Sequence, residues 1–194
     1  MKLRIEPVEA KRESYSGVAE RDVTARKTCI LDFIMQPQAL PKWCWAAIAV
    51  SLGQYYETRS WEQHELASAL LGFDCSSFDN QLDVRLRSDN CANLDEALRL
   101  AGCYSHWSPG RPTFERLRSE IDAGRPLCLE VQWYRGGSHF LVISGYHADT
   151  REVYVDDPLN GPSVQPFENF PRSYRAFGGV WRGTFWTCQS QPNA

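Results

Sequence analysis

Apolar residues in the middle of the chain recur with the period of an α-helix. Residues 43–56 form a nearly continuous run of helix-forming and apolar residues shortly after Pro41. In residues 94–101, apolar side chains fall at positions i, i+3, i+4 and i+7, which places them on one helical face. Start and stop signals delimit three further helices. One begins at a capping box at Ser60 and stops at Gly72, and another begins at a capping pattern at Asn93 and stops at Gly102. The last begins at Thr113 and stops at Gly124.

The last third of the chain carries the patterns of β-strands. Residues 127–133 and 139–146 are apolar and rich in β-formers, and residues 152–156 alternate valine with polar side chains. Residues 180–188 are aromatic and β-branched, and turns are expected at 136–137 and 148–151. Helices followed by antiparallel strands predict an α+β domain rather than a repeated βαβ unit.

Composition narrows the functional classes. The 194 residues, 43% of them hydrophobic, suffice for one domain with a packed core. Lys and Arg (21) are fewer than Asp and Glu (24), which argues against a nucleic-acid-binding surface. No apolar run approaches the ~18 residues of a membrane span, so no membrane partner is expected. The oligomeric state is left open.

The first 28 residues are charged and contain no apolar run of the ~7–15 residues that a secretory signal requires. They predict an N-terminal arm, residues 1–28, which is either disordered or a pro-segment, ahead of one domain at residues 29–194. A cytoplasmic location is the default expectation, and delivery out of the cell by a leaderless route stays open.

Seven cysteines, none in a Cys-x-x-Cys pair, predict mostly buried free thiols. Cys44 differs because it stands at the head of the helix predicted for residues 43–56. A helix N-terminus carries partial positive charge and unpaired N–H groups, and both stabilise a thiolate. Cys44 is therefore the candidate nucleophile, and Trp43 and Trp45 beside it are expected to line a substrate cleft.

His139 is the candidate base. It follows the glycine-rich residues 136–138, which leave one side of the imidazole open, and it begins a predicted strand. The remaining histidines occupy less favourable positions: His64 within a helix, His147 near a turn, and His106 in a loop, where a zinc site with Cys91 and Cys103 would have irregular spacing. No metal or cofactor is expected.

Asp157 is the candidate partner for the His139 ring. It ends a predicted strand directly before Pro158, and a turn centred near Ala148 would place it opposite His139. Attack on an amide also requires donors for an oxyanion. The Cys44 N–H can supply one, and the side-chain amide of Gln38 or Gln36 can supply the other.

Two segments together resemble the papain-like cysteine peptidases. The first is Gln38 followed six residues later by Cys44-Trp45-Ala46. The second runs from Gly137-Ser138-His139 to Asp156-Asp157-Pro158 and is similar to compact bacterial members, including bacteriocin-leader-processing peptidases and effector cysteine proteases of plant pathogens. The resemblance extends over about residues 31–188, and residues 124–127 fit the same layout.

The resemblance implies a papain-like fold in which a helical part carries the nucleophile on a central helix, packed on a C-terminal antiparallel sheet. It implies Cys44 as nucleophile, His139 as base and then acid, Asp157 as orienting group with Asp156 in reserve, and Gln38 with the Cys44 N–H as oxyanion donors. The implied activity is hydrolysis of a protein or peptide through an acyl-enzyme, in an enzyme that acts as a bacterial effector or toxin.

Two departures and two alternatives accompany this interpretation. Leader-processing peptidases carry Cys-Gly after an acidic residue, whereas here Trp43 and Trp45 flank the cysteine, which argues against a double-glycine leader as substrate. Larger papain relatives have asparagine where this chain has Asp157. The alternatives are a deamidase, amidase or transglutaminase-like enzyme with the same residues, and a catalytically silent binding domain.

Overall fold

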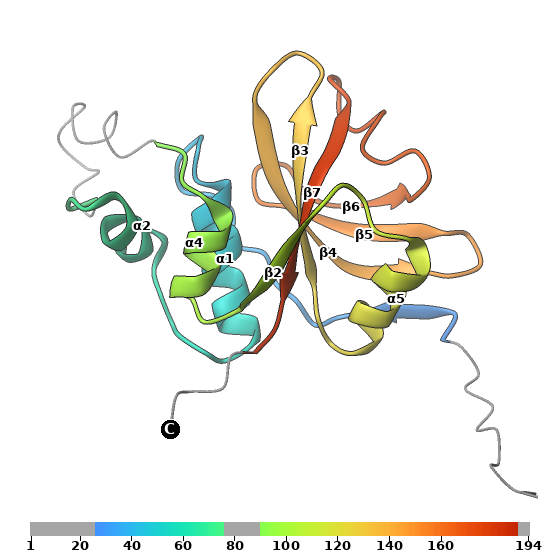
Figure 1. The fold of residues 1–194 in the computed structure, drawn as a ribbon, viewed down its shortest axis with the longest axis horizontal. Coiled ribbons are helices and arrows are strands. Elements are labelled where there is room, and N and C mark those ends of the chain that lie inside the picture. The colour runs from blue at the N-terminus through green and yellow to red at the C-terminus, as the bar shows by residue number, and fades with distance from the viewer. Residues whose placement is uncertain (1–25, 76–89, 190–194) are drawn as a thin grey trace, which may run out of the picture.

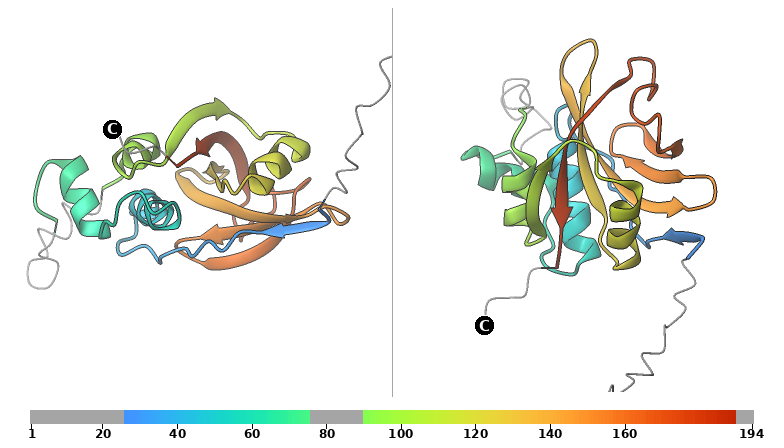
Figure 2. Two further views of the ribbon diagram at one scale, coloured as in Figure 1. Left: turned by 90° about the horizontal axis from the view of Figure 1, so that it is seen from below. Right: turned by 45° about the vertical axis from the view of Figure 1, so that its right-hand side comes forward.

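A computed structural model describes residues 26–75 and 90–189 of the chain. Three helices pack together on one side of the molecule, and a curved sheet with one further helix forms the other side (Figures 1 and 2). The helical part consists of α1 (Cys44–Tyr55), α2 (Gln63–Leu71) and α4 (Leu94–Leu100), and α5 (Phe114–Asp122) lies against the sheet. The α+β prediction is confirmed.

The sheet has seven strands, and all of its pairings are antiparallel. The order is β2-β7-β3-β4-β5-β6, with β1 paired to β4. The central strands are those that the sequence predicts, within two residues at each end. The strands are β1 (Thr28–Ile30), β2 (Tyr104–Pro109), β3 (Leu127–Trp133), β4 (Ser138–His147), β5 (Glu152–Asp157), β6 (Gly161–Pro166) and β7 (Gly179–Thr187).

Three strands lie outside the sequence prediction, and each lacks the pattern of a buried strand. Strand β1 has three residues, and it begins at Thr28, the last residue of the predicted arm. Strands β2 and β6 lie at the two ends of the sheet order, have no buried residue and contain proline. Proline is tolerated at a sheet edge because an edge N–H has no partner to lose. Residues 1–25 of the arm lie outside the described residues.

Helix α1 is buried on nearly every side. Ten of its residues are buried, including alanines at 46, 47 and 49 that let neighbouring elements approach closely. A helix that is apolar all round belongs inside a core. Trp43 and Trp45 are 0% and 1% exposed, so the expectation that they line a cleft is wrong. Both rings belong to the core around α1, and the Trp45 indole N–H donates to the Asn90 carbonyl at 3.1 Å.

The helix ends follow local chemistry, with one shift. Thr113 caps α5 by accepting from the Arg116 N–H, and Gly72 ends α2 with a positive φ of 76°, as predicted. The capping box of α2 lies at Glu62 and Glu65 instead of Ser60. The Glu62 side chain accepts the Glu65 N–H and the Glu65 side chain accepts the Glu62 N–H, so the helix begins two residues later than the serine suggests.

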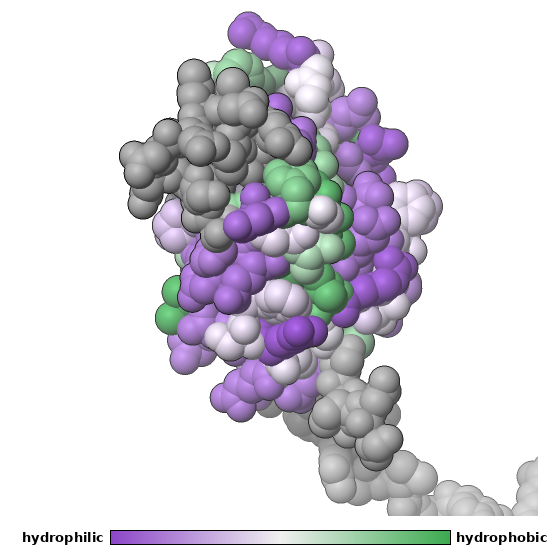
Figure 3. Space-filling view, turned by 90° about the vertical axis from the view of Figure 1, so that its left-hand side faces the viewer, coloured by the Kyte–Doolittle hydropathy of each residue, from purple (hydrophilic) through white to green (hydrophobic). Residues whose placement is uncertain are grey.

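The two parts have separate cores. One surrounds α1 and reaches the sheet at Cys128, Val142 and Phe185, whereas the other lies within the curl of the sheet under α5. On the helical side of the molecule, hydrophobic surface forms a narrow band between hydrophilic flanks (Figure 3). None of the helices in the described part of the chain is long and apolar enough to cross a bilayer.

Candidate active site

Cys44 and His139 meet where the helical part joins the sheet. Cys44 is the first residue of α1 and is 8% exposed. A residue at this position has no acceptor for its N–H within the helix. His139 lies at the start of β4, 7% exposed, and its ring makes a side-chain hydrogen bond with Cys44. The head of the helix and the start of a central strand thus bring together a thiol and an imidazole distant in sequence.

Asp157 holds the other side of the imidazole. His139 Nε2 donates to Asp157 Oδ1 at 2.8 Å, which leaves Nδ1 for Cys44. The two residues are not directly opposite, and the expectation of a turn centred near Ala148 is wrong. Val142 pairs with Asp156 and Ile143 with Val155, so each β4 residue lies opposite a β5 residue two positions later than expected. A bulge in β4 follows these two pairs. Because the shift is even, Asp157 stays on the His139 face and reaches the ring diagonally.

Asp156, the reserve candidate, points to the opposite face. It accepts a hydrogen bond from the Ser144 hydroxyl, and it pairs with Val142, whose side chain belongs to the core around α1. Burial raises the pKa of its carboxyl, and the Ser144 bond opposes that rise. The alternation of side chains along β5 therefore separates the two aspartates, and only Asp157 contacts His139.

Five donors besides His139 surround the Asp157 carboxylate, which is buried. Its Oδ1 accepts from the backbone N–H groups of Leu159 and Asn160 at 2.8 and 3.1 Å. Its Oδ2 accepts from Asn160 Nδ2 at 2.8 Å and the Tyr174 hydroxyl at 2.9 Å, and Arg175 lies 3.7 Å away. Sequence reasoning missed Asn160, Tyr174 and Arg175, which belong to loops whose only local signal is Asn-Gly at 160–161.

These contacts set the charges of the pair. Burial opposes charge on Asp157, but the bonds from His139, Asn160 and Leu159 outweigh it and hold its pKa well below the usual value. Burial likewise opposes charge on His139, but its bonds to Asp157 and Cys44 raise its pKa to about 9. At neutral pH the imidazole is therefore protonated beside an ionised carboxylate.

Two aromatic rings shield this ion pair. The Trp133 ring stacks on the His139 ring with centroids 6.2 Å apart. It also stacks on the Tyr174 ring, with centroids 6.3 Å apart. Tyr174 is 2% exposed, and burial together with the Asp157 charge raises the pKa of its hydroxyl to about 12. The phenol thus stays a donor across the working pH range, and water is kept from the Asp157 side of the ring.

We expect Tyr174→Phe to lower the free energy of unfolding by about 1.5–3 kcal/mol, because it removes a buried hydrogen bond to a charged acceptor. Urea unfolding checks the value. Tyr154→Phe is the matched control, since the Tyr154 side chain is half-buried and its hydroxyl has no hydrogen-bond partner among the described residues. Equal losses in both variants would contradict a specific role for the Tyr174 hydroxyl.

Gln38 is held near the site but with its amide engaged. Its backbone N–H donates to the Pro158 carbonyl at 2.9 Å, which ties the segment before α1 to the Asp157 loop. Its Nε2 donates to the carbonyls of Leu40 and Pro41 at 2.8 and 2.6 Å, and Oε1 is buried without a partner. Gln36, the other candidate, accepts from Gln63 at 3.4 Å and lies with α2 instead.

The remaining cysteines and histidines do not form a second reactive centre. All seven cysteines are free thiols, five of them buried, and burial raises the pKa of Cys103 to about 12. His106 lies on β2, not in a loop, and stacks on Trp186. Within residues 26–75 and 90–189, no three His, Cys, Asp or Glu side chains are grouped to hold a metal, the suggested Cys91, Cys103 and His106 included.

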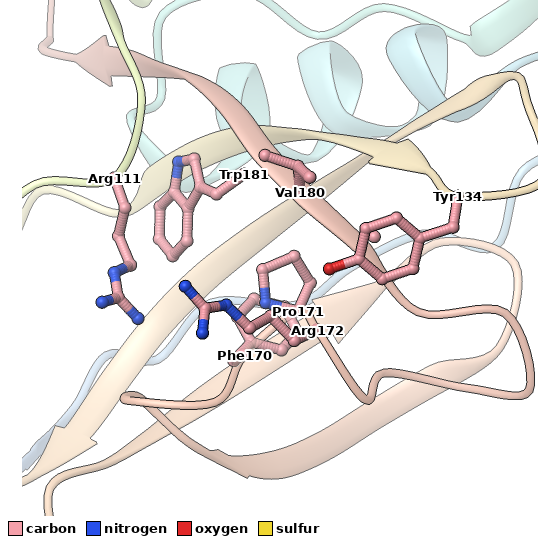
Figure 4. Close-up of a pocket in the computed structure, with 8 residues that line it drawn as sticks. Arg111, Tyr134, Phe170, Pro171, Arg172, Val180 and Trp181 are labelled. Carbon is pink, nitrogen blue, oxygen red and sulfur yellow. The ribbon is translucent and has the colours of Figure 1, made fainter.

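Two hollows border the 170–179 loop. One, of about 410 Å³, is lined by His139, Trp133, Leu159 and Phe177 and opens at the imidazole. The other, of about 430 Å³, lies away from it, with the Arg111 and Arg172 guanidinium groups near one end and Tyr134 at the other (Figure 4). No cysteine or histidine lines this second hollow, whereas the His139 imidazole lines the first.

Comparison with known proteins agrees with the geometry. Residues 27–175 match the model of the family described as papain-like cysteine protease AvrRpt2. The fold is similar to the crystal structure of xylellain, a cysteine protease from Xylella fastidiosa, with a TM-score of 0.52 and 14% identity over 96% of this chain and 95% of that one. No curated protein sequence is significantly similar. The chain therefore belongs to the AvrRpt2 family of papain-like cysteine proteases and is a cysteine-type peptidase.

Proposed function

We propose that the enzyme cleaves peptide bonds with Cys44 as nucleophile, His139 as acid and base, and Asp157 as orienting group. The observation that carries this proposal is the chain of contacts from Cys44 through His139 to Asp157. The imidazolium and the N-terminus of α1 both favour the thiolate, which is the nucleophilic form of cysteine. An aspartate takes the place of the asparagine of larger relatives, and its charge holds the proton on His139.

The reaction begins when the Cys44 thiolate attacks the carbonyl carbon and the π electrons move to oxygen. His139 then gives its proton to the amine as the C–N bond breaks, leaving a thioester on Cys44. Neutral His139 next accepts a proton from water, which attacks the thioester. The carboxylic acid product leaves, and the thiolate and imidazolium are restored.

The oxyanion is stabilised by the Cys44 backbone N–H and by the Gln38 amide. The Gln38 amide currently bonds two neutral carbonyls, Leu40 and Pro41. An oxyanion is a stronger acceptor than a neutral carbonyl, so exchange of one of these bonds is favourable in the transition state. The bond from the Gln38 N–H to Pro158 keeps the side chain close while its amide turns.

Covalent labelling tests the proposal. We expect brief treatment with a peptidyl epoxide at pH 6 to modify Cys44 once, found by mass spectrometry of the peptide that contains it. His139→Ala should abolish this labelling, because it removes the cation that stabilises the thiolate. His147→Ala, a change at the far end of the same strand, is the matched control and should label normally. Labelling spread over several cysteines would overturn the proposed pair.

We further propose that the enzyme is a bacterial effector or toxin whose substrate is a protein of another cell. The support is the similarity of the Cys44 and His139–Asp157 segments to effector cysteine proteases of plant pathogens. Adding the enzyme to a plant cell extract should produce new protein N-termini, detectable by mass spectrometry. A Cys44→Ala sample provides the background, and an N-terminal profile identical to it would argue against the proposal.

A further inference from the structure

The hollow at His139 is bounded in part by large apolar side chains that the core does not bury. Leu159 and Phe177 are 59% and 50% exposed, although large apolar side chains are usually buried, and both line this hollow. Pro41 and Trp133 complete its apolar wall, and Arg175 its polar edge. Apolar groups held in a concave surface beside reactive atoms are the ordinary form of a binding subsite.

The loop that carries this wall is rigidly placed. The Tyr134 N–H donates to the Gly178 carbonyl at 3.1 Å, the Gly178 N–H donates to Tyr174, and the Tyr174 hydroxyl donates to Asp157. Gly178 has a φ of +59°, and a Cβ there would lie 2.2 Å from the Arg172 carbonyl, so only glycine fits. Phe177 is thus presented by a loop fixed to the same carboxylate that orients His139.

The position of the hollow decides which half of a substrate enters it. His139 must reach the leaving amine to protonate it, so the chain beyond that amine runs along the His139 side. The next residue, Phe140, faces the opposite side of β4 and lines a separate groove of about 420 Å³ between the start of α4 and the sheet. Neither Cys44 nor His139 lines that groove, so of the two it is the hollow at His139 that adjoins the leaving amine.

Charge restricts the occupant further. The Asp157 carboxylate is fully buried and saturated with donors, so it presents no negative surface to the hollow. Arg175 and the His139 imidazolium both line the hollow and are positive. A cationic side chain entering it would therefore meet two like charges before acylation, and still Arg175 in the acyl-enzyme, without a free carboxylate among its lining residues.

We infer that this hollow is a specificity pocket for a large apolar or aromatic side chain within the first two residues after the scissile bond, and that it disfavours Lys and Arg there. The inference rests on the proposed function, since it needs an acyl-enzyme at Cys44. The Leu159 and Phe177 side chains are not required for the chemistry itself, so the pocket inference can fail while the proposed function stands.

Acyl transfer to added amines measures the pocket directly. A peptide ester acylates Cys44 and its alcohol leaves, after which water and an added amine compete for the thioester. Attack by the amine forms a C–N bond and breaks the C–S bond, while the surplus proton of the amine passes through His139. The amine must first occupy the leaving side, so the ratio of aminolysis to hydrolysis reports binding there.

The amines are the amides of Phe, Gly and Arg, and of the dipeptides Gly-Phe, Gly-Gly and Gly-Arg. In either the amino-acid amides or the dipeptide amides, we expect the ratio of aminolysis to hydrolysis to be at least about tenfold higher for the Phe compound than for the Gly compound. This is the preference expected when an aromatic ring enters an apolar pocket. The Arg member should fall below the Phe member. Phe177→Ala and Leu159→Ala should each reduce the preference for Phe, whereas Val164→Ala, an exposed valine on β6 outside the pocket, should keep it.

The outcomes separate the two claims. Equal partition among all six amines, from an acyl-enzyme that forms normally, overturns the pocket and leaves the proposed peptidase intact. A Phe preference unchanged in both alanine variants also overturns it, because the selectivity then comes from elsewhere. If no acyl-enzyme forms from the ester, the proposed function fails, and the pocket inference fails with it. Both variants replace exposed side chains, so they are expected to fold.

Discussion

Cys44→Ala should lower the rate of peptide-bond cleavage by at least about 10⁴-fold, because no other group near His139 can form the acyl-enzyme. The fold should persist, because alanine is a good helix former at the head of α1. The change removes only one sulfur atom, from a side chain that is 8% exposed and so not fully enclosed by the core. Cleavage of an unfolded protein such as casein, followed through the release of new α-amino groups, measures the loss.

The matched control for this prediction is Cys91→Ala. Cys91 is exposed and lies before α4, so its removal should leave the rate unchanged. Measuring ammonia in the same samples separates peptide-bond cleavage from deamidation, because a deamidase releases ammonia without new α-amino groups. Substantial cleavage by Cys44→Ala would remove Cys44 from the mechanism, and ammonia as the main product would replace the peptidase with a deamidase.

Asp157→Asn should lower kcat/KM by about 10²-fold and move the basic limb of the pH profile downwards. The N–H groups of Leu159 and Asn160 both donate to the Oδ1 position, so they select the amide oxygen there. His139 Nε2 can then still donate, which avoids the ~10⁴-fold loss that a carboxylate-to-amide change causes when the tautomer is wrong. What is lost is the negative charge.

That charge determines the pH dependence. In the wild type, kcat/KM should fall as pH rises through about 9, where His139 loses the proton that the leaving amine needs. Without the Asp157 charge this limb should move towards the ordinary histidine value near 6.5. Asp156→Asn is the matched control, because Asp156 bonds Ser144 and not His139. A basic limb that stays in place in Asp157→Asn would contradict the assignment.

The free energy of unfolding should also depend on pH through His139 and Asp157, and the two contributions are lost in opposite directions of pH. The His139 pKa is raised on folding, so its contribution is complete below about pH 6.5 and is lost as pH rises through about 9. The Asp157 pKa is lowered, so its contribution is present above about pH 4 and is lost as pH falls. Asp157→Ala, which strands buried donors, should cost about 3–5 kcal/mol, as measured by urea unfolding.

Local sequence signals determined the elements that carry the site. The apolar run after Pro41 predicts α1, and the Gly-rich residues before His139 predict the start of β4, because helix propensity, capping and strand alternation act over a few residues. Cys44 at a helix head and His139 at a strand head are therefore visible in the sequence alone. Edge strands β2 and β6 are not, since neither has a buried face to impose alternation.

The partners of Asp157 were decided by tertiary structure. The hairpin register depends on where the β4–β5 turn is centred and on the bulge at Ser144, and a turn one position later changes which residues lie opposite. Tyr174 reaches the carboxylate from a loop after β6, and Trp133 covers the imidazole from β3, by contacts between distant segments. The sequence by itself therefore determined the candidate nucleophile, the candidate base and the helices and strands that carry them. The folded chain alone decided which aspartate holds the histidine, what shields the pair and what shapes the pocket beside it, because a local pattern specifies the face of a strand but not the neighbours that folding brings to it.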